Sequence, residues 1–67
     1  MNLDKLLLLR RKYKLTQEEI ANQLGITAPA YSMKESGKQN FTAEQISKLF
    51  KYFQKLEPQL NMQDIFL

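Results

Sequence analysis

Cysteine and histidine are absent from this sequence of 67 residues, and glycine and proline occur only twice each. Without cysteine and histidine there can be no disulfide bridge, no cysteine–histidine zinc finger and no histidine-based catalysis. With hydrophobic residues at 43%, the few glycines and prolines indicate a folded chain. So short a chain buries only about 60% of its unfolded surface, which leaves little room for a substrate cleft. We expect one small domain over residues 1–67 that binds a partner, without cofactor, metal or enzymatic activity.

Long apolar runs are also missing. None reaches the roughly 18 residues that a membrane span requires, and acidic Asp4 precedes the short run Leu6–Leu9 where a signal peptide would carry positive charge. We therefore expect a cytoplasmic protein that does not contact a membrane. Ten basic residues against seven acidic ones give a net charge of +3. This mild excess permits a polyanionic partner but does not require one.

The elements that the sequence does predict are helices, since valine is absent and no stretch alternates as a strand would. Thr16 and Thr42 are each followed three residues later by Glu or Gln, which is the spacing of a capping box. Thr27 can cap a further helix that has Pro29 in its first turn. Apolar residues recur at helical spacing after each start. We predict an all-α fold with helices at about 2–13, 17–24, 28–36, 43–55 and 62–67.

The second and third predicted helices are separated only by Gly25, Ile26 and Thr27. A turn this short, with a glycine, between two helices of about eight residues has the geometry of a helix-turn-helix, here at about 17–36. The short link makes the two helices cross steeply, Ala21 permits their close approach, and Ile26 fills the corner. The later helix is left protruding, as entry into a major groove about 12 Å wide requires.

These residues carry a family resemblance. The run LTQEEIANQLGIT, followed by Tyr31, Glu35, Gly37 and Lys38, resembles the phage repressor and Cro family, also called the XRE or lambda-repressor-like family. The resemblance extends over about residues 6–53. It implies a compact five-helix DNA-binding domain, usually dimeric, that regulates transcription.

The resemblance also implies roles for individual residues. Those expected to face base edges or their flanking phosphates are Thr27, Ala28, Pro29, Ser32 and Met33. Those expected to contact phosphates are Gln17, Lys34, Lys38, Gln39 and Asn40. An ion pair is expected between Arg10 and Glu35. Because the base-facing set lacks long polar side chains, we predict readout through thymine methyl groups, supplemented by DNA shape and phosphate anchoring.

Several of these assignments have a plainer alternative. Gln17 could be a solvated residue of the first turn, Met33 a packing residue at a helix edge, and Lys38 an ordinary exposed lysine. Tyr31 is expected in the core. Lys14 stands where the family often has glycine, and it would be strained if that position is left-handed.

The C-terminal end is rich in large apolar residues, and we expect a dimer surface there, formed by Leu60, Met62, Phe66 and Leu67. The alternative is that these residues only cap the core. Two recognition helices are needed to read half-sites about 34 Å apart, which favours a homodimer.

The leading hypothesis is a sequence-specific regulator of transcription that binds operator DNA as a homodimer, without a small-molecule effector. The alternative is an antitoxin-type or other protein-interaction module that uses exposed apolar residues of the first and last helices. A DNA-binding regulator should lose affinity steeply as salt rises, whereas a protein-interaction module should not.

Overall fold

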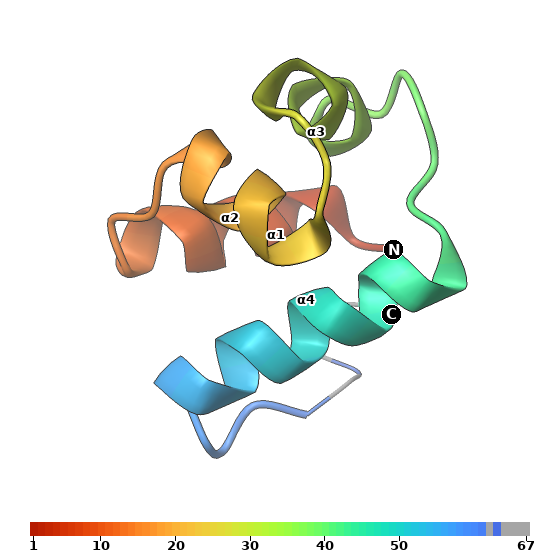
Figure 1. Ribbon diagram of the computed structural model, residues 1–67. Helices are drawn as coiled ribbons and strands as arrows, with labels where there is room; N and C mark the ends of the chain where they lie inside the picture. Colours follow the sequence, from red (N-terminus) through yellow and green to blue (C-terminus); the bar gives the residue numbers. More distant parts are fainter. Residues whose placement is uncertain (62, 64–67) are drawn as a thin grey trace.

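The computed structural model describes residues 1–61 and 63, and this part of the chain contains four α-helices (Figure 1). They are α1 (Leu3–Lys12), α2 (Gln17–Leu24), α3 (Ala28–Glu35) and α4 (Ala43–Leu56). The prediction of an all-α fold is confirmed for these residues, and the predicted bounds agree to about one residue. The described residues hold four helices and not the five that we predicted. The fifth, expected at 62–67, falls on residues that, apart from 63, lie outside the description.

Each of the four helices begins at a side chain that caps it. Asn2, Thr16, Thr27 and Thr42 each accept a hydrogen bond, at 3.0–3.3 Å, from the backbone N–H three residues further on. At Thr42 the capping box is complete, because the Gln45 side chain also accepts from the Thr42 backbone N–H at 3.0 Å. The three threonine caps were predicted from the sequence, whereas the cap at Asn2 was not. A cap of this kind stabilises a helix by about 1 kcal/mol.

The core lies where α2 packs against both α3 and α4. In Figure 1, α3 lies at one end of the molecule, α4 runs along the opposite side, and α1 and α2 lie between them. The predicted core position of Tyr31 is confirmed, since it is completely buried. The full set of buried apolar residues is Leu6, Leu9, Ile20, Ala21, Leu24, Tyr31, Leu49, Phe53 and Leu60. Burying a large side chain of this kind contributes about 1.5–3 kcal/mol, so this one cluster holds the helices together.

The turn between α2 and α3 has the predicted geometry. Gly25 ends α2 in the left-handed region, with φ at 72°. The Ile26 backbone N–H then donates to the Ala21 carbonyl at 3.0 Å, and the Ile26 side chain packs against the core. Ala21 is buried, which allows the two helices to approach closely. The result is a helix-turn-helix in which α3 lies at the edge of the molecule.

The link between α1 and α2 stores backbone strain. Lys14 has a φ of 54°, which places a residue with a β-carbon in the left-handed region, as the sequence analysis anticipated. Two hydrogen bonds hold the link in this shape. The Leu15 backbone N–H donates to the Arg10 carbonyl at 3.0 Å, and Arg10 Nη1 donates to the Leu15 carbonyl at 3.0 Å.

α4 is the longest helix, with 14 residues, and it is strongly amphipathic. Leu49 and Phe53 are fully buried, whereas Lys48, Lys51 and Lys55 are exposed. The three lysines therefore face solvent while the apolar residues of the same helix face the core. Within the described part of the chain, no helix has the length and apolar character needed to cross a membrane.

Candidate nucleic-acid interface

The outward face of α3 carries the residues expected to read DNA. Tyr31 anchors the inner face, completely buried. Pro29 and Met33 are exposed, Met33 at 40%, and Ser32 is half-buried. Positions 32 and 33 lie three and four residues after position 29, so each of these side chains is a neighbour of Pro29 on the helix surface. These three side chains therefore form one solvent-facing surface.

The remaining two expected base-reading residues lie at the start of the helix. Thr27 is exposed, and its hydroxyl oxygen is already used as the helix cap, where it accepts from the Ala30 backbone N–H. Ala28 is half-buried and offers a methyl group. With eight residues, α3 is about 12 Å long, which is comparable to the width of the major groove.

Behind this surface, the Glu35 carboxylate joins α1, α2 and α3. It forms a bidentate ion pair with Arg10, at 2.8 Å from Nε to Oε2 and 3.1 Å from Nη2 to Oε1. The Tyr31 hydroxyl donates to Oε2 at 2.6 Å, and Gln17 Nε2 donates to Oε1 at 3.2 Å. The side chains of Arg10 and Glu35 are only 18% and 9% exposed. The ion pair that the family resemblance implies is therefore present and largely shielded from solvent.

This network also shifts two pKa values. Burial by itself raises the pKa of Glu35, but the hydrogen bonds from Arg10, Tyr31 and Gln17 outweigh it and hold the pKa below its usual value. For Tyr31, burial and the hydrogen bond to Glu35 both raise the pKa. Glu35 is therefore ionised and Tyr31 neutral around pH 7.

The contacts of Gln17 and Tyr31 with Glu35 were not found by sequence reasoning. A signal existed for Tyr31, because residues 31 and 35 are four apart on one helix and so face each other. Nothing local indicates the contact of Gln17, which depends on how α2 and α3 cross. The Gln17 amide nitrogen carries two N–H groups, and Glu35 takes one of them. The amide therefore carries a second N–H besides the one that Glu35 accepts.

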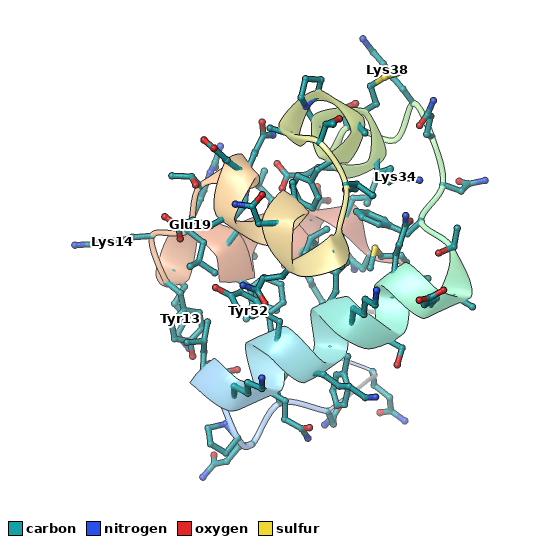
Figure 2. All side chains as sticks on the ribbon, in the orientation of Figure 1. Tyr13, Lys14, Glu19, Lys34, Lys38 and Tyr52 are labelled. Carbon is teal, nitrogen blue, oxygen red and sulfur yellow. The ribbon has the colours of Figure 1, made fainter. Side chains whose placement is uncertain are left out.

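The loop that follows α3 carries the other expected phosphate contacts, Lys38, Gln39 and Asn40, and all three are exposed. Figure 2 shows Lys38 extending away from the body of the molecule. Lys34 differs from them. Its Nζ donates to the Asn40 carbonyl at 2.9 Å and lies 6.0 Å from the centre of the Phe41 ring. The ammonium group of Lys34 is therefore turned toward the loop.

The basic residues at the end of α1 do not form one patch. Arg10 is bound to Glu35, and Lys12 forms a salt bridge with Glu57. Glu57 also accepts from the Tyr13 hydroxyl at 2.7 Å. The hydrogen bonds from Lys12 and Tyr13 lower the pKa of Glu57. Arg10 and Lys12 are therefore both paired with carboxylates of the same chain.

The expected dimer surface is only partly covered by the structure. Leu60 belongs to the core of the single chain, with 5% of its surface exposed, and so it offers little to a partner. Met62, Phe66 and Leu67 lie outside the described residues. Leu8 and Leu56 are the exposed leucines of the described part, at 66% and 41%. The run Leu6–Leu9 cannot face inward along its whole length, which accounts for the exposure of Leu8.

The arrangement of α2, the glycine turn and α3 defines a helix-turn-helix DNA-binding domain. A protein-family model described as Helix-turn-helix matches residues 6–60, which include all of α2, α3 and α4. The chain belongs to this family, of the Cro and XRE type that the sequence resembles, and the family consists of DNA-binding regulators and not of enzymes. Comparisons with curated proteins and with solved structures give no significant match.

Proposed function

We propose that this protein regulates transcription by binding a specific double-stranded DNA sequence with α3 in the major groove. The observation that carries the proposal is the surface formed by Pro29, Ser32 and Met33, which faces solvent while Tyr31 anchors the same helix in the core. A helix braced from behind keeps its outward side chains in a fixed register. Such a register is what the reading of base edges requires.

Phosphate contacts position the protein on the duplex. Gln17 has one amide N–H left after its bond to Glu35, and it lies in the first turn of α2, where the helix dipole favours an anion. Lys38, Gln39 and Asn40 extend from the exposed loop after α3. These contacts carry affinity, whereas the α3 surface carries the sequence preference.

The α3 surface offers methyl and methylene groups, a thioether and one hydroxyl, but no charge. Bidentate reading of guanine or adenine uses Arg, Lys, Asn or Gln. We therefore expect the preference to depend on thymine methyl groups and on DNA shape. Single-base substitutions across a bound site would measure this preference. A dominant requirement for guanines beneath α3 would contradict it.

The assigned roles can be tested by selecting bound sites from random duplexes and repeating the selection with variants. Gln17→Ala is expected to weaken binding to all sequences about equally, because a phosphate contact carries no sequence information. Ser32→Ala is expected to change the preference at one base pair. Gln23→Ala, which alters an exposed glutamine elsewhere on α2, serves as the control and should change neither. If both Gln17→Ala and Ser32→Ala bind and select like the parent protein, the assignments are wrong.

A homodimer is part of the proposal, because one α3 helix reads only a few base pairs and paired half-sites are about 34 Å apart. Selected sites should then be palindromic, and sedimentation of the DNA complex should give two chains per duplex. A single half-site bound by one chain would contradict this.

One feature supports the second candidate function, a protein-interaction module. Leu8 is 66% exposed on α1. It lines a cavity of about 320 Å³ with Lys5, Leu9, Lys12, Glu57 and Leu60. Association through apolar residues would depend little on salt, whereas DNA binding through several phosphates weakens steeply as salt rises.

A further inference from the structure

Lys34 occupies an unusual place for a basic residue of a DNA-binding helix. It is half-buried on α3, one residue before Glu35. Its ammonium group donates to the Asn40 carbonyl at 2.9 Å, and the Phe41 ring centre lies 6.0 Å away, within the range of a cation–π contact. Both partners belong to the segment after α3, so this side chain connects the helix to the following loop.

Other contacts hold the loop on both sides of this point. The backbone N–H groups of Lys38 and Gln39 donate to the Met33 carbonyl at 2.9 and 3.2 Å. Phe41 packs against the core, with its ring centre 5.9 Å from that of Tyr31. Asn40 lies between these two anchors and is exposed. The hydrogen bond from Lys34 fixes the backbone at this intermediate point.

Close packing does not hold the loop at this point in place of the hydrogen bond from Lys34 to the Asn40 carbonyl. A cavity of about 90 Å³ lies beside the loop, and Lys34, Gln39 and Asn40 are among the residues that line it. Figure 2 shows the Lys34 side chain on the side of α3 that faces the loop, whereas Lys38 extends outward. The two lysines therefore have different environments although they are only four residues apart.

We infer that Lys34 is a positioning residue for DNA binding: its ammonium group holds the loop at Asn40, so that Lys38, Gln39 and Asn40 meet DNA in a fixed arrangement, and it does not itself neutralise a phosphate. This inference rests on the proposed function. A loop that is ordered before binding avoids the entropy cost of being ordered on DNA.

The two possible roles of Lys34 differ in their salt dependence. Each phosphate that a protein neutralises releases counterions, which adds about 0.9 to the slope of log affinity against log salt concentration. A residue that only orders the loop leaves Lys38 able to reach its phosphate at an added entropy cost, so its removal changes the affinity but not the slope. The slope therefore distinguishes a positioning residue from a direct contact.

The experiment measures the affinity of four proteins for a selected duplex between roughly 50 and 200 mM salt. Lys34→Met, which keeps the apolar stem, should weaken binding roughly three- to tenfold at every salt concentration with the slope unchanged. Lys38→Met should reduce the slope by about 0.9. Lys51→Met removes the same charge from an exposed site on α4 and should match the parent protein.

A second measurement reports on the loop without DNA. In the free Lys34→Met protein, NMR order parameters of the amides at 38–40 should fall, while those of α2 stay unchanged. A loop as ordered as in the parent protein would overturn the inference.

The outcomes separate the inference from the proposed function. If Lys34→Met lowers the slope as Lys38→Met does, Lys34 contacts a phosphate itself and the inference fails, while the proposed function stands. If Lys34→Met binds DNA like the parent protein, the hydrogen bond from Lys34 to Asn40 has no role in DNA binding and the inference fails. If the parent protein shows no salt-dependent DNA binding, the proposed function fails and the inference with it.

Discussion

At the last residue of α3, the carboxylate of Glu35 accepts hydrogen bonds from Arg10, Tyr31 and Gln17, which belong to three different helices. The Arg10 side chain is only 18% exposed, so removing its partner leaves a shielded charge without compensation. At the scale of single residues, this cluster fixes both the crossing of α1 with α3 and the orientation of the Gln17 amide.

Glu35→Gln should therefore lower the free energy of unfolding by about 3 kcal/mol, because a shielded Arg10 loses its counter-charge. Urea denaturation measures this. The control is Glu44→Gln, which alters a side chain that is 79% exposed and paired with Lys48 at 3.4 Å. It should cost less than about 0.5 kcal/mol. Equal effects of the two substitutions would contradict the role given to Glu35.

The same residue gives a pH dependence of stability. Because the folded-state pKa of Glu35 lies below its unfolded value, its contribution is fully present above the unfolded pKa of about 4.3 and is lost as the pH falls through the folded pKa. The difference in unfolding free energy between the parent protein and Glu35→Gln should be constant above about pH 5 and narrow in more acidic solution. A difference that widens on acidification would show that the pKa shift has the opposite sign.

Lys14 allows a stabilising substitution. Its φ of 54° costs about 1–2 kcal/mol, because the β-carbon is crowded in the left-handed region. Glycine would remove this cost, but it would lose about 0.5–1 kcal/mol more conformational entropy on folding. Lys14→Gly should raise the free energy of unfolding by about 0.5–1 kcal/mol, measured by urea denaturation. Lys14→Gln removes the charge but keeps the β-carbon, and it should change little. If Lys14→Gln stabilises as much, charge and not backbone strain is responsible.

At the scale of elements, the turn between α2 and α3 decides how α3 is presented. Gly25 has a φ of 72°, and a β-carbon built there would meet nothing within 4 Å. The cost of Gly25→Ala is therefore one of backbone conformation alone, about 1–2 kcal/mol in a denaturation measurement. Gly25→Asn should cost less, because asparagine tolerates this region better. An alanine variant as stable as the parent protein would contradict the geometry of the turn.

Local signals explain why the helices could be predicted from the sequence. Thr16, Thr27 and Thr42 cap helices through backbone groups only three residues away, and Gly25 ends α2 by its own conformation. None of these features depends on a distant part of the chain. Short stretches of sequence therefore determine the boundaries of the helix-turn-helix.

What could not be predicted depends on contacts between distant residues. Leu60 was expected on a dimer surface but lies in the core, because the chain turns after α4, with the Leu60 backbone N–H bound to the Glu57 carbonyl at 2.9 Å. Glu57 is in turn held by Lys12 and Tyr13 of the distant first segment. The partner of the Lys34 ammonium could not be predicted from the sequence either, because it is a backbone carbonyl whose position depends on the path of the loop.

At the scale of the whole molecule, the charges and the uncharged surface are separated. The chain carries a net charge of +3, yet the surface of Pro29, Ser32 and Met33 bears none. Lys38 lies in the loop beside this surface, while Lys48 and Lys51 lie on α4, at the opposite side of the molecule from α3 (Figure 1). The proposed division between phosphate anchoring and base contact follows from this distribution.

NMR titration of the protein with a selected duplex tests most directly whether α3 enters the major groove. The largest changes in amide chemical shift should fall at residues 27–33 and 38–40, with Gln17 also shifted and the amides of α4 nearly unchanged. If the changes fall instead on α1 and α4 while those of α3 stay in place, the helix does not lie in the groove.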